Sequence, residues 1–216
     1  MRDNYEKQLK MLNNEMIEMG KLIENAIDMA ISALKGKDKE LAKKVINLDT
    51  SIDKGYKDIE NMCLNLLLRQ QPVAADLRNI SSALKMITDM ERIGDHAADI
   101  SEITLLIADS DYENNLCHIE KMAEETTWML VNGIDAFINK DEKKARDVIE
   151  HDDIVDNLFD VSKNSLIGLI NKNIARGEQA ADLLMISKYF ERIGDHATNI
   201  AEWVIYSITG IHNDMN

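Results

Sequence analysis

The stretch MERIGDHAADI at residues 90–100 recurs as FERIGDHATNI at residues 190–200. The hexapeptide Glu-Arg-Ile-Gly-Asp-His is identical in both copies, in a chain of 216 residues with a formal net charge of -14. Around each copy the apolar residues recur with the 3.6-residue period of an α-helix. The repeat therefore predicts two equivalent helices in a duplicated fold.

The duplication extends upstream of the hexapeptide. The segment AKKVINLDTSIDKGY at 42–56 aligns with ARDVIEHDDIVDNLF at 145–159 at a constant offset of 103, whereas the hexapeptides lie 100 residues apart. The loop between the two aligned regions must therefore differ by three residues between the halves. We predict a tandem duplication of a three-helix unit, with a first domain at residues 1–110 and a second at 111–216.

The composition favours an all-α fold. Leu, Ile, Met, Ala, Glu and Lys dominate, aromatic residues make up 5% of the chain, and there are one proline and nine glycines. Connections are predicted at residues 70–72, 108–115, 139–141 and 171–179. Six helices are predicted. The first three cover residues 4–35, 38–69 (with Asp38 as N-cap) and 74–108. The fourth covers 116–138, the fifth runs from the turn at 139–141 to 172, and the sixth runs from the loop at 171–179 to 210. Long helices with short connections pack antiparallel, which predicts two tandem antiparallel three-helix bundles.

The acidic charge argues against nucleic acid as the main partner, because binding to a phosphate backbone needs clustered Lys and Arg. Residues 1–108 carry 15 basic and 18 acidic side chains, a balance of -3, and residues 109–216 carry 10 and 21, a balance of -11. The second half is therefore favoured as the seat of cation binding or of a basic partner. A merely solvated acidic surface would give the same balance.

The two cysteines and the N-terminus favour the cytoplasm. Cys63 and Cys117 show no CxxC spacing, as is usual for thiols in a reducing compartment, and we expect both to be packing residues. The N-terminus carries no apolar targeting segment, and no stretch approaches the roughly 20 apolar residues of a membrane span. We predict a soluble, cytoplasmic protein.

Carboxylates interrupt an apolar stripe within each hexapeptide. Glu91 and Asp95 are four residues apart and share one helix face, where the stripe upstream is apolar. Glu191 and Asp195 repeat the pair. Two carboxylates one turn apart repel each other unless positive charge lies between them.

The same spacing occurs on the second helix of each half, so four carboxylates could converge in each bundle. All-oxygen ligation suits Fe³⁺, Mn²⁺, Mg²⁺ or Ca²⁺, with Zn²⁺ possible. A solvated acidic face, with Arg92 and Arg192 as partners, is the alternative. The candidate metal ligands are Asp49, Asp53, Glu91, Asp95, Asp152, Asp156, Glu191 and Asp195.

The other residues of the motif have separate roles. Gly94 and Gly194 let a neighbouring helix or a hydrated ion approach closely, at a helix-propensity cost of ~1 kcal/mol. His96 and His196 lie about 100° around the helix from the aspartates. They could ligate, support a ligand, or sit neutrally between helices, and the last is favoured over ligation. Asp99 faces Asn199 in the alignment, which argues against it as a ligand.

The chain resembles the PhoU family of accessory and regulatory proteins of the phosphate-specific transport system. The resemblance covers essentially the whole chain: its length, its six helices, the E(D)xxxD pairs and the ERIGDH hexapeptide with the following ATNIAE at 197–202. The earlier copy reads AADISE at 97–102, a departure that puts only Asp99 in question.

The resemblance implies a cytoplasmic, often dimeric, metal-binding protein that is not an enzyme and has neither catalytic nor organic-cofactor residues. The family binds metal ions, including multinuclear iron or zinc clusters, on the faces that carry these motifs. It restrains the phosphate-starvation response and phosphate uptake by linking the transporter ATPase to a membrane sensor histidine kinase. We therefore expect a metal-binding adaptor and negative regulator of phosphate homeostasis that forms a homodimer.

Two functions of other classes compete with this expectation. One is a carboxylate-bridged metalloenzyme, of the di-iron or phosphohydrolase type. Ferritin-like di-iron sites use a Glu-x-x-His pair, which does not occur at these motifs, and no GxxxxGK[ST] phosphate loop is present. The other is a purely structural helical scaffold, whose stability would not respond to a chelator.

Overall fold

The computed structural model describes residues 2–70, 73–110, 112 and 116–211. Every regular element in these ranges is helical. In chain order the elements are α1 (Arg2–Gly36), α2 (Lys39–Gln70), α3 (Ala74–Ile107), α4 (Cys117–Asn139), α5 (Glu142–Lys172), the short 3₁₀-helix η2 (Ile174–Arg176) and α6 (Gly177–Thr209). The predicted all-α fold of two tandem three-helix bundles is confirmed.

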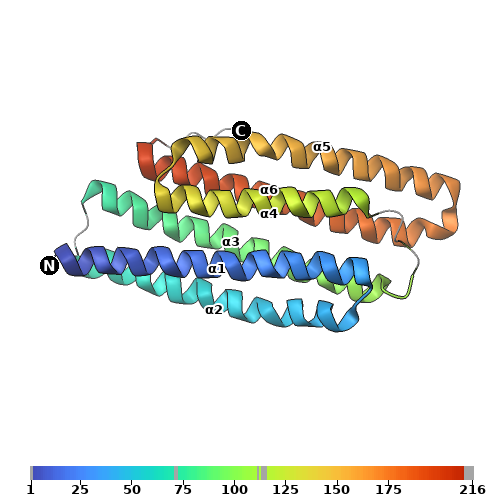
Figure 1. Ribbon diagram of the computed structural model, residues 1–216, viewed down its shortest axis with the longest axis horizontal. Coiled ribbons are helices and arrows are strands. Elements are labelled where there is room, and N and C mark those ends of the chain that lie inside the picture. The colour runs from blue at the N-terminus through green and yellow to red at the C-terminus, as the bar shows by residue number, and fades with distance from the viewer. Residues whose placement is uncertain (1, 71–72, 111, 113–115, 212–216) are drawn as a thin grey trace.

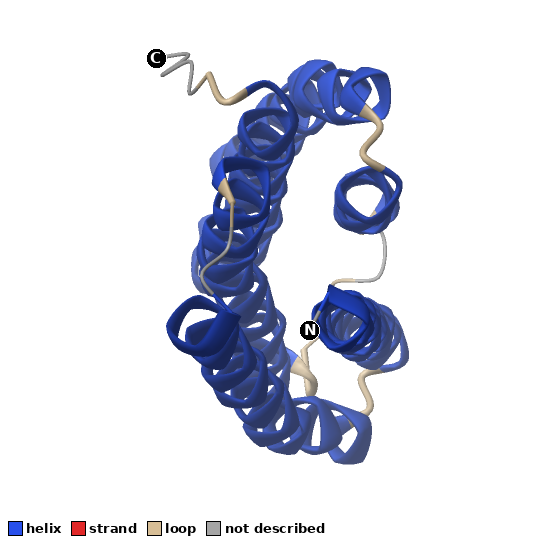
Figure 2. Ribbon diagram, turned by 90° about the vertical axis from the view of Figure 1, so that its left-hand side faces the viewer, coloured by secondary structure: helices blue, strands red, loops and turns tan. Residues whose placement is uncertain are grey.

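The two bundles lie side by side with their helices nearly parallel or antiparallel (Figure 1). Contacts join α2 to α3, α3 to α6, and α6 to α5, so these four helices form one continuous row. Helix α1 packs on α2 and α3, α4 packs on α5 and α6, and α1 also meets α4. Viewed along the helices, the row is curved (Figure 2). The hexapeptide helices α3 and α6 are therefore central, and the bundles meet along them.

Equivalent turns begin the second helix of each bundle. Lys37 and Lys140 adopt left-handed backbone conformations with φ of 52° and 53°. The Asp38 carboxylate accepts hydrogen bonds from the backbone N–H groups of Glu40 and Leu41 at 3.0 and 2.9 Å, so the predicted N-cap is confirmed. The turn geometry places the aligned carboxylates of α2 and α5 at the same height in their bundles.

The apolar stripes of the hexapeptide helices form the core. All side chains of both stripes are buried: Met86, Met90, Ile93, Ala97 and Ile100 on α3, and Phe190, Ile193, Ala197 and Ile200 on α6. They belong to a single hydrophobic cluster that draws residues from all six α-helices. This burial holds α3 and α6 in fixed register and leaves their carboxylate stripes at the helix seams.

The predicted loop at residues 171–179 is wrong for most of its length. Helix α5 continues to Lys172, η2 follows, and α6 already begins at Gly177. The Asn173 side chain accepts a hydrogen bond from the backbone N–H of Ala175 at 3.1 Å, which ends one helix and starts the next within a few residues. The polar composition that predicted a loop belongs to the exposed end of α5, to η2 and to a polar first turn of α6.

Other predicted connections have different outcomes. Gln70, expected in a turn, is the last residue of α2, while Gln71 and Pro72 lie outside the described residues. The same holds for residues 111 and 113–115 of the predicted linker, and the proposed boundary between residues 110 and 111 falls between α3 and α4. None of the described helices is both long and apolar enough to cross a membrane.

The cysteine prediction is half right. Cys63 is buried in the core, where burial raises the pKa of its thiol to about 12. Cys117 is exposed at the first residue of α4 and is not a packing residue.

Candidate metal centre

The α2/α3 seam brings the acidic pairs of the first bundle together. One carboxylate oxygen each from Asp49, Asp53 and Asp95 lies within 4.8 Å of the other two. Glu91 is not one of these three, but it lies near enough that, beside burial, the charges of Asp95, Asp53 and Asp49 raise the pKa of its carboxyl. Three of the four predicted residues of this bundle therefore converge with Glu91 beside them, and we call the four the first cluster.

The close approach of α2 to α3 at this cluster depends on Gly94. A Cβ added there would lie 2.9 Å from Cδ1 and 3.0 Å from Cγ2 of Ile52, which sits between Asp49 and Asp53 in the sequence. Contacts this short are tighter than almost all real Cβ contacts, so a larger residue would require Ile52 or the helix that carries it to shift. The expectation that Gly94 admits a neighbouring helix is confirmed.

Asp49 is the residue of the first cluster that has an unpaired buried oxygen. Burial raises the pKa of its carboxyl, and the nearby charges of Asp95, Asp53 and Asp99 raise it further. Its Oδ1 atom is buried and has no hydrogen-bond partner among the described residues. A buried carboxylate oxygen that accepts no hydrogen bond destabilises the folded protein, so a proton or a cation bound at this atom would be stabilising.

Arg92 supplies positive charge from the rim. Its Nη1 donates a hydrogen bond to Asp95 Oδ2 at 2.8 Å, and its Nε lies 3.7 Å from Glu91 Oε2. The Arg92 side chain is 56% exposed, so solvent screens much of this attraction. The carboxylate oxygens of Asp49, Asp53 and Asp95 lie close together even with Arg92 beside them.

The second cluster lies on the α5/α6 seam and consists of Asp152, Asp156, Glu191 and Asp195. Burial raises the pKa of Asp152 to about 6, with further contributions from the charges of the other three. Asp152 Oδ1 is buried without a hydrogen-bond partner among the described residues, as is the equivalent oxygen of Asp49. The same atom is therefore left unpaired in both halves of the repeat.

Gly194 plays the same part as Gly94 but faces a ligand. A Cβ at Gly194 would lie 3.0 Å from Asp152 Oδ1 and 3.3 Å from Val155 Cγ1. The missing side chain thus makes room for the unpaired carboxylate oxygen itself. A neighbouring helix thus comes close at both motif glycines, and the approach of a hydrated ion stays a prediction.

The two clusters have different cations beside them. Lys188 forms an ion pair with Glu191, three residues later on α6. The corresponding position in the first bundle is Thr88, since the hexapeptide helices align at an offset of 100. Sequence reasoning missed Lys188, although a basic residue one turn before the motif glutamate was a readable signal.

The motif histidines meet between the bundles. The rings of His96 and His196 have centroids 5.5 Å apart, and His96 also lies 5.3 Å from the Tyr189 ring. His196 Nδ1 lies 2.8 Å from Asp89 Oδ1, to which Asn199 also donates a hydrogen bond at 3.1 Å. The favoured prediction, histidines placed between helices, is confirmed.

Asp99 and Asp89 contact the histidine pair in different ways. Asp99 Oδ2 lies 3.2 Å from His96 Nδ1 on its own helix, whereas Asp89 reaches across from α3 to α6. Burial lowers the pKa of His96, the hydrogen bond and charge of Asp99 oppose this, and the neighbouring His196 and Arg192 lower the pKa further. These groups tie the two bundles together at the level of the acidic clusters.

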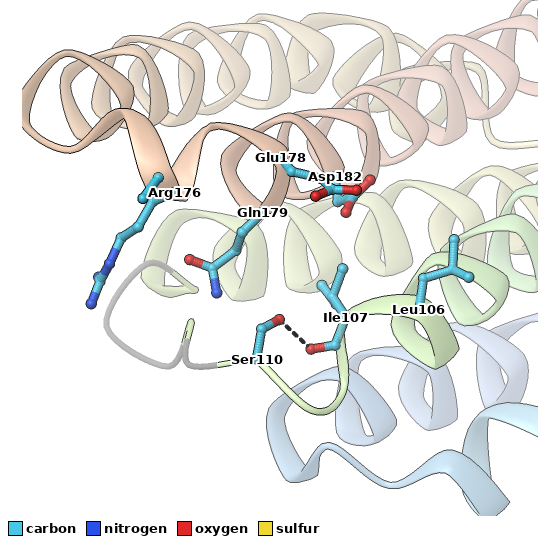
Figure 3. Close-up of a pocket in the computed structure, with 8 residues that line it drawn as sticks. Leu106, Ile107, Ser110, Arg176, Glu178, Gln179 and Asp182 are labelled. Atoms are coloured by element: carbon cyan, nitrogen blue, oxygen red, sulfur yellow. Dashed lines mark hydrogen bonds between the residues drawn. The ribbon is translucent and has the colours of Figure 1, made fainter.

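A cavity of about 630 Å³ lies away from both clusters, at the end of the molecule. Figure 3 shows Leu106, Ile107 and Ser110 on one side and residues from the start of α6 on the other. Three of the α6-side residues, Arg176, Glu178 and Asp182, are charged and of mixed sign. The cavity contains none of the eight predicted ligands and does not alter their assignment as the candidate site.

The donor set of both clusters fits a hard cation. Carboxylate oxygens are the ligands that Mg²⁺, Ca²⁺, Mn²⁺ and ferric iron prefer, and the buried unpaired oxygens of Asp49 and Asp152 supply lone pairs that the described chain does not use. Asp49, Asp53, Glu91 and Asp95 could hold an ion on one seam, and Asp152, Asp156, Glu191 and Asp195 could hold another. The site residues stay predictions, made more specific by this geometry.

The sequence matches the PhoU domain family twice, over residues 16–104 and 119–204. A relative from Clostridium acetobutylicum, described as a phosphate-specific transport system accessory protein PhoU homolog, is 35% identical over 213 residues, 98% of this chain and 97% of the relative. A homolog of the same description from Aquifex aeolicus is 36% identical over 86% of this chain and 84% of the relative.

Solved structures agree with this assignment. The crystal structure of PhoU from Pseudomonas aeruginosa superposes with a TM-score of 0.91 at 29% identity, covering 96% of this chain and all of that one. The phosphate transport system regulatory protein PhoU from Streptococcus pneumoniae gives a TM-score of 0.89 at 29% identity, covering 98% of this chain and all of that one. Two matched domains, relatives aligned over nearly the full length, and a shared fold lead to one conclusion. The chain belongs to the PhoU family.

Proposed function

We propose that this protein is a metal-binding cytoplasmic adaptor of phosphate transport, which negatively regulates phosphate uptake and the phosphate-starvation response rather than catalysing a reaction. Relatives described as accessory proteins of the phosphate-specific transport system support the phosphate role. The partners we propose are the ATPase subunit of a phosphate ABC transporter and a sensor histidine kinase, and the proposed working form is a homodimer. Iron and zinc are the proposed ions, with Mg²⁺, Mn²⁺ and Ca²⁺ as further candidates.

One observation carries the metal part of the proposal: the equivalent Oδ1 atoms of Asp49 and Asp152 are both buried and unpaired within an acidic cluster. A single acidic cluster on a helix is common without an ion. Two at matching positions of a duplication, each with the same orphaned oxygen, form a built feature of the fold.

The chain's own residues would couple ion binding to the shape of the surface. A bound cation supplies positive charge that offsets the repulsion among the carboxylates. Asp49 and Asp53 would then be held against Glu91 and Asp95, which fixes the α2/α3 spacing that Gly94 permits. The second cluster does the same for α5 and α6, so a partner would meet a different outer surface with and without the ion.

Metal analysis tests the ligand assignment. The protein, purified without chelator, is compared with a Glu91→Gln, Asp95→Asn, Glu191→Gln, Asp195→Asn variant by elemental analysis. The unmodified chain should retain bound metal, and the variant should retain much less, because each cluster has lost half of its carboxylates. Equal metal contents in the two proteins would remove the assignment.

A matched control separates ligation from general acidity. Four exposed acidic residues outside the clusters are neutralised instead, which changes the net charge by the same amount. Metal content should then stay at the level of the unmodified chain. The control substitutions are Glu15→Gln, Asp58→Asn, Asp147→Asn and Glu150→Gln.

A pull-down tests the adaptor role. The tagged chain is recovered from cells grown in excess phosphate, and the bound proteins are identified. We expect a transporter ATPase, a sensor kinase or both, with less of each on the cluster variant than on the matched control. Recovery of neither partner by the unmodified chain would contradict the adaptor proposal while leaving metal binding intact.

A further inference from the structure

Lys188 occupies a position inside the second cluster that no cation occupies in the first. It stands one turn before Glu191 on the same face of α6 and pairs with that carboxylate. Burial and the charge of Glu191 raise the pKa of Asp156 and Asp195, and the Lys188 ammonium opposes the rise in both. Three of the four carboxylates of the second cluster therefore sense this ammonium.

The surroundings hold Lys188 in place. Its ammonium lies 5.3 Å from the centroid of the Phe159 ring, so the aromatic face also attracts the charge. The side chain is 38% exposed, whereas that of Glu191 is only 15% exposed. The pair is thus partly withdrawn from water, where an ion pair is screened less.

The first cluster has different residues at both positions. Thr88 replaces Lys188 and Tyr56 replaces Phe159, so neither the ammonium nor its ring support is present. The first cluster does have a cation beside it, because Arg92 contacts both Asp95 and Glu91, but the Arg92 side chain is 56% exposed against 38% for Lys188. Within the described residues, only Asp49, Asp53 and Asp95 bring three carboxylate oxygens within 4.8 Å of one another. No three carboxylates of the second cluster meet this distance among the described residues, and Lys188 is paired with one of them, Glu191.

We infer that Lys188 is a built-in counter-ion of the second cluster, which a metal ion must compete with, so that the two clusters fill in order, the first before the second. The inference rests on the proposed function, since it concerns the regulation of the same sites. The overall charge alone would favour cation binding in the second half, which carries the larger negative balance. Solvent and salt largely screen charges more than about 10 Å away, however, so the groups next to the site matter most. The nearest ammonium outweighs distant carboxylates.

Sequential filling gives the molecule a graded response. At low ion concentration the α2/α3 seam is fixed while the α5/α6 seam is still neutralised by Lys188. At higher concentration the ion displaces the ammonium, which keeps its contact with Phe159. The second bundle is therefore the part that changes with ion supply.

The experiment isolates each cluster in the intact chain and titrates it with Mn²⁺ alone by calorimetry. Asp49→Asn with Asp95→Asn disables the first cluster, and Asp152→Asn with Asp195→Asn disables the second. Lys188→Met is then added to the chain that keeps the second cluster, because methionine retains the apolar stem on Phe159 without the charge. We expect Mn²⁺ to bind at least about tenfold tighter, the effect of removing a unit charge a few ångströms from a carboxylate site.

The repeat supplies the reciprocal substitution and the controls. Thr88→Lys, in the chain that keeps the first cluster, should weaken Mn²⁺ binding by a similar factor. Lys188→Arg keeps the charge and should bind as weakly as the parent. Lys163→Met removes the other ammonium over Phe159, which pairs with Asp160 and not with the cluster, and should change nothing. Circular dichroism checks that each variant is folded.

The outcomes separate this inference from the proposed function. Equal Mn²⁺ affinity of folded Lys188→Met and its parent, or tighter binding by the second cluster than by the first, would overturn the inference alone. If neither cluster of the otherwise unmodified chain binds Mn²⁺, zinc or iron, the metal function falls and the inference falls with it. Tightening by Lys188→Met and weakening by Thr88→Lys together would establish it.

Discussion

At the scale of single residues, Asp152 shows what the acidic clusters cost the metal-free protein. Its carboxyl is half-buried among like charges, and one oxygen has no donor in the described chain. Such a group is stable in the fold either protonated or beside a cation. The stability of the protein should therefore depend on both pH and metal.

The pH dependence has a definite sign. The pKa of Asp152 is about 6 in the folded protein, above the value of about 3.9 expected for an unfolded chain. Proton binding then favours the folded state, and this stabilisation is lost as the pH rises through 6. In chelator, the free energy of unfolding should fall between pH 5 and 7, with a contribution from Asp152 of roughly 1 kcal/mol after allowance for solvent screening.

Urea denaturation of the parent and of Asp152→Asn at both pH values measures this contribution. The fall from pH 5 to 7 should be smaller in the variant by about that amount, because asparagine does not titrate. His96, whose pKa is lowered by burial, acts in the opposite direction but equally in both proteins, so it cancels in the difference. Identical pH profiles would contradict the assignment of the raised pKa to Asp152.

At the scale of helices, the seam between α2 and α3 depends on the absence of a side chain at Gly94. Alanine would gain ~1 kcal/mol in helix propensity. It would also press against both Cδ1 and Cγ2 of Ile52, a β-branched side chain that cannot move both atoms away at once. Overpacking of this kind costs about 1–3 kcal/mol, so Gly94→Ala should be destabilising by roughly 1 kcal/mol in urea denaturation.

Gly168 provides the matched control for Gly94→Ala. It also lies inside a helix, but a Cβ there would meet nothing within 4 Å. Gly168→Ala should stabilise the protein by roughly 0.5–1 kcal/mol through helix propensity and the unfolded chain. Adding Ile52→Val to Gly94→Ala removes the Cδ1 contact and should restore part of the lost stability. Equal effects of alanine at both glycines would mean that the α2/α3 seam is not tightly packed.

At the scale of the whole molecule, the two bundles share one core. The buried cluster is continuous across them, and His196 and Asn199 of α6 both contact Asp89 of α3. A Cβ at Gly20 of α1 would lie 2.5 Å from Ile134 of α4, so these helices are also in close contact. The halves of the duplication should therefore unfold together.

The positions of the tryptophans allow a direct measurement of this cooperativity. Both of them, Trp128 and Trp203, lie in the second bundle, so their fluorescence reports that bundle, whereas circular dichroism reports all six helices. In urea the two signals should give the same midpoint, as expected for one cooperative unit. A fluorescence transition separated from that of circular dichroism would show that the bundles unfold independently.

Much of the fold follows from local sequence. The helices, the Asp38 cap and the duplicated units could be predicted because periodicity, capping residues and repeat offsets act over a few residues. The start of α6 could not, because a polar first turn of a helix has the composition of a loop. The exposure of Cys117 was missed for a related reason: burial depends on what covers a position, which spacing does not give.

The eight carboxylates could be named from spacing alone, since residues four apart share a helix face wherever the helix lies. Which of them converge was decided by the tertiary structure, through the Ile52–Gly94 contact that brings Asp49 and Asp53 to Asp95. The meeting of His96 with His196 also comes from packing between helices far apart in the chain, whereas Lys188 pairs with Glu191 only three residues away on α6. Short-range periodicity determined which charged side chains share a face of each helix. The close packing of α2, α3, α5 and α6 decided which charges share a site, because electrostatic interactions depend on distance in space and not on separation in sequence.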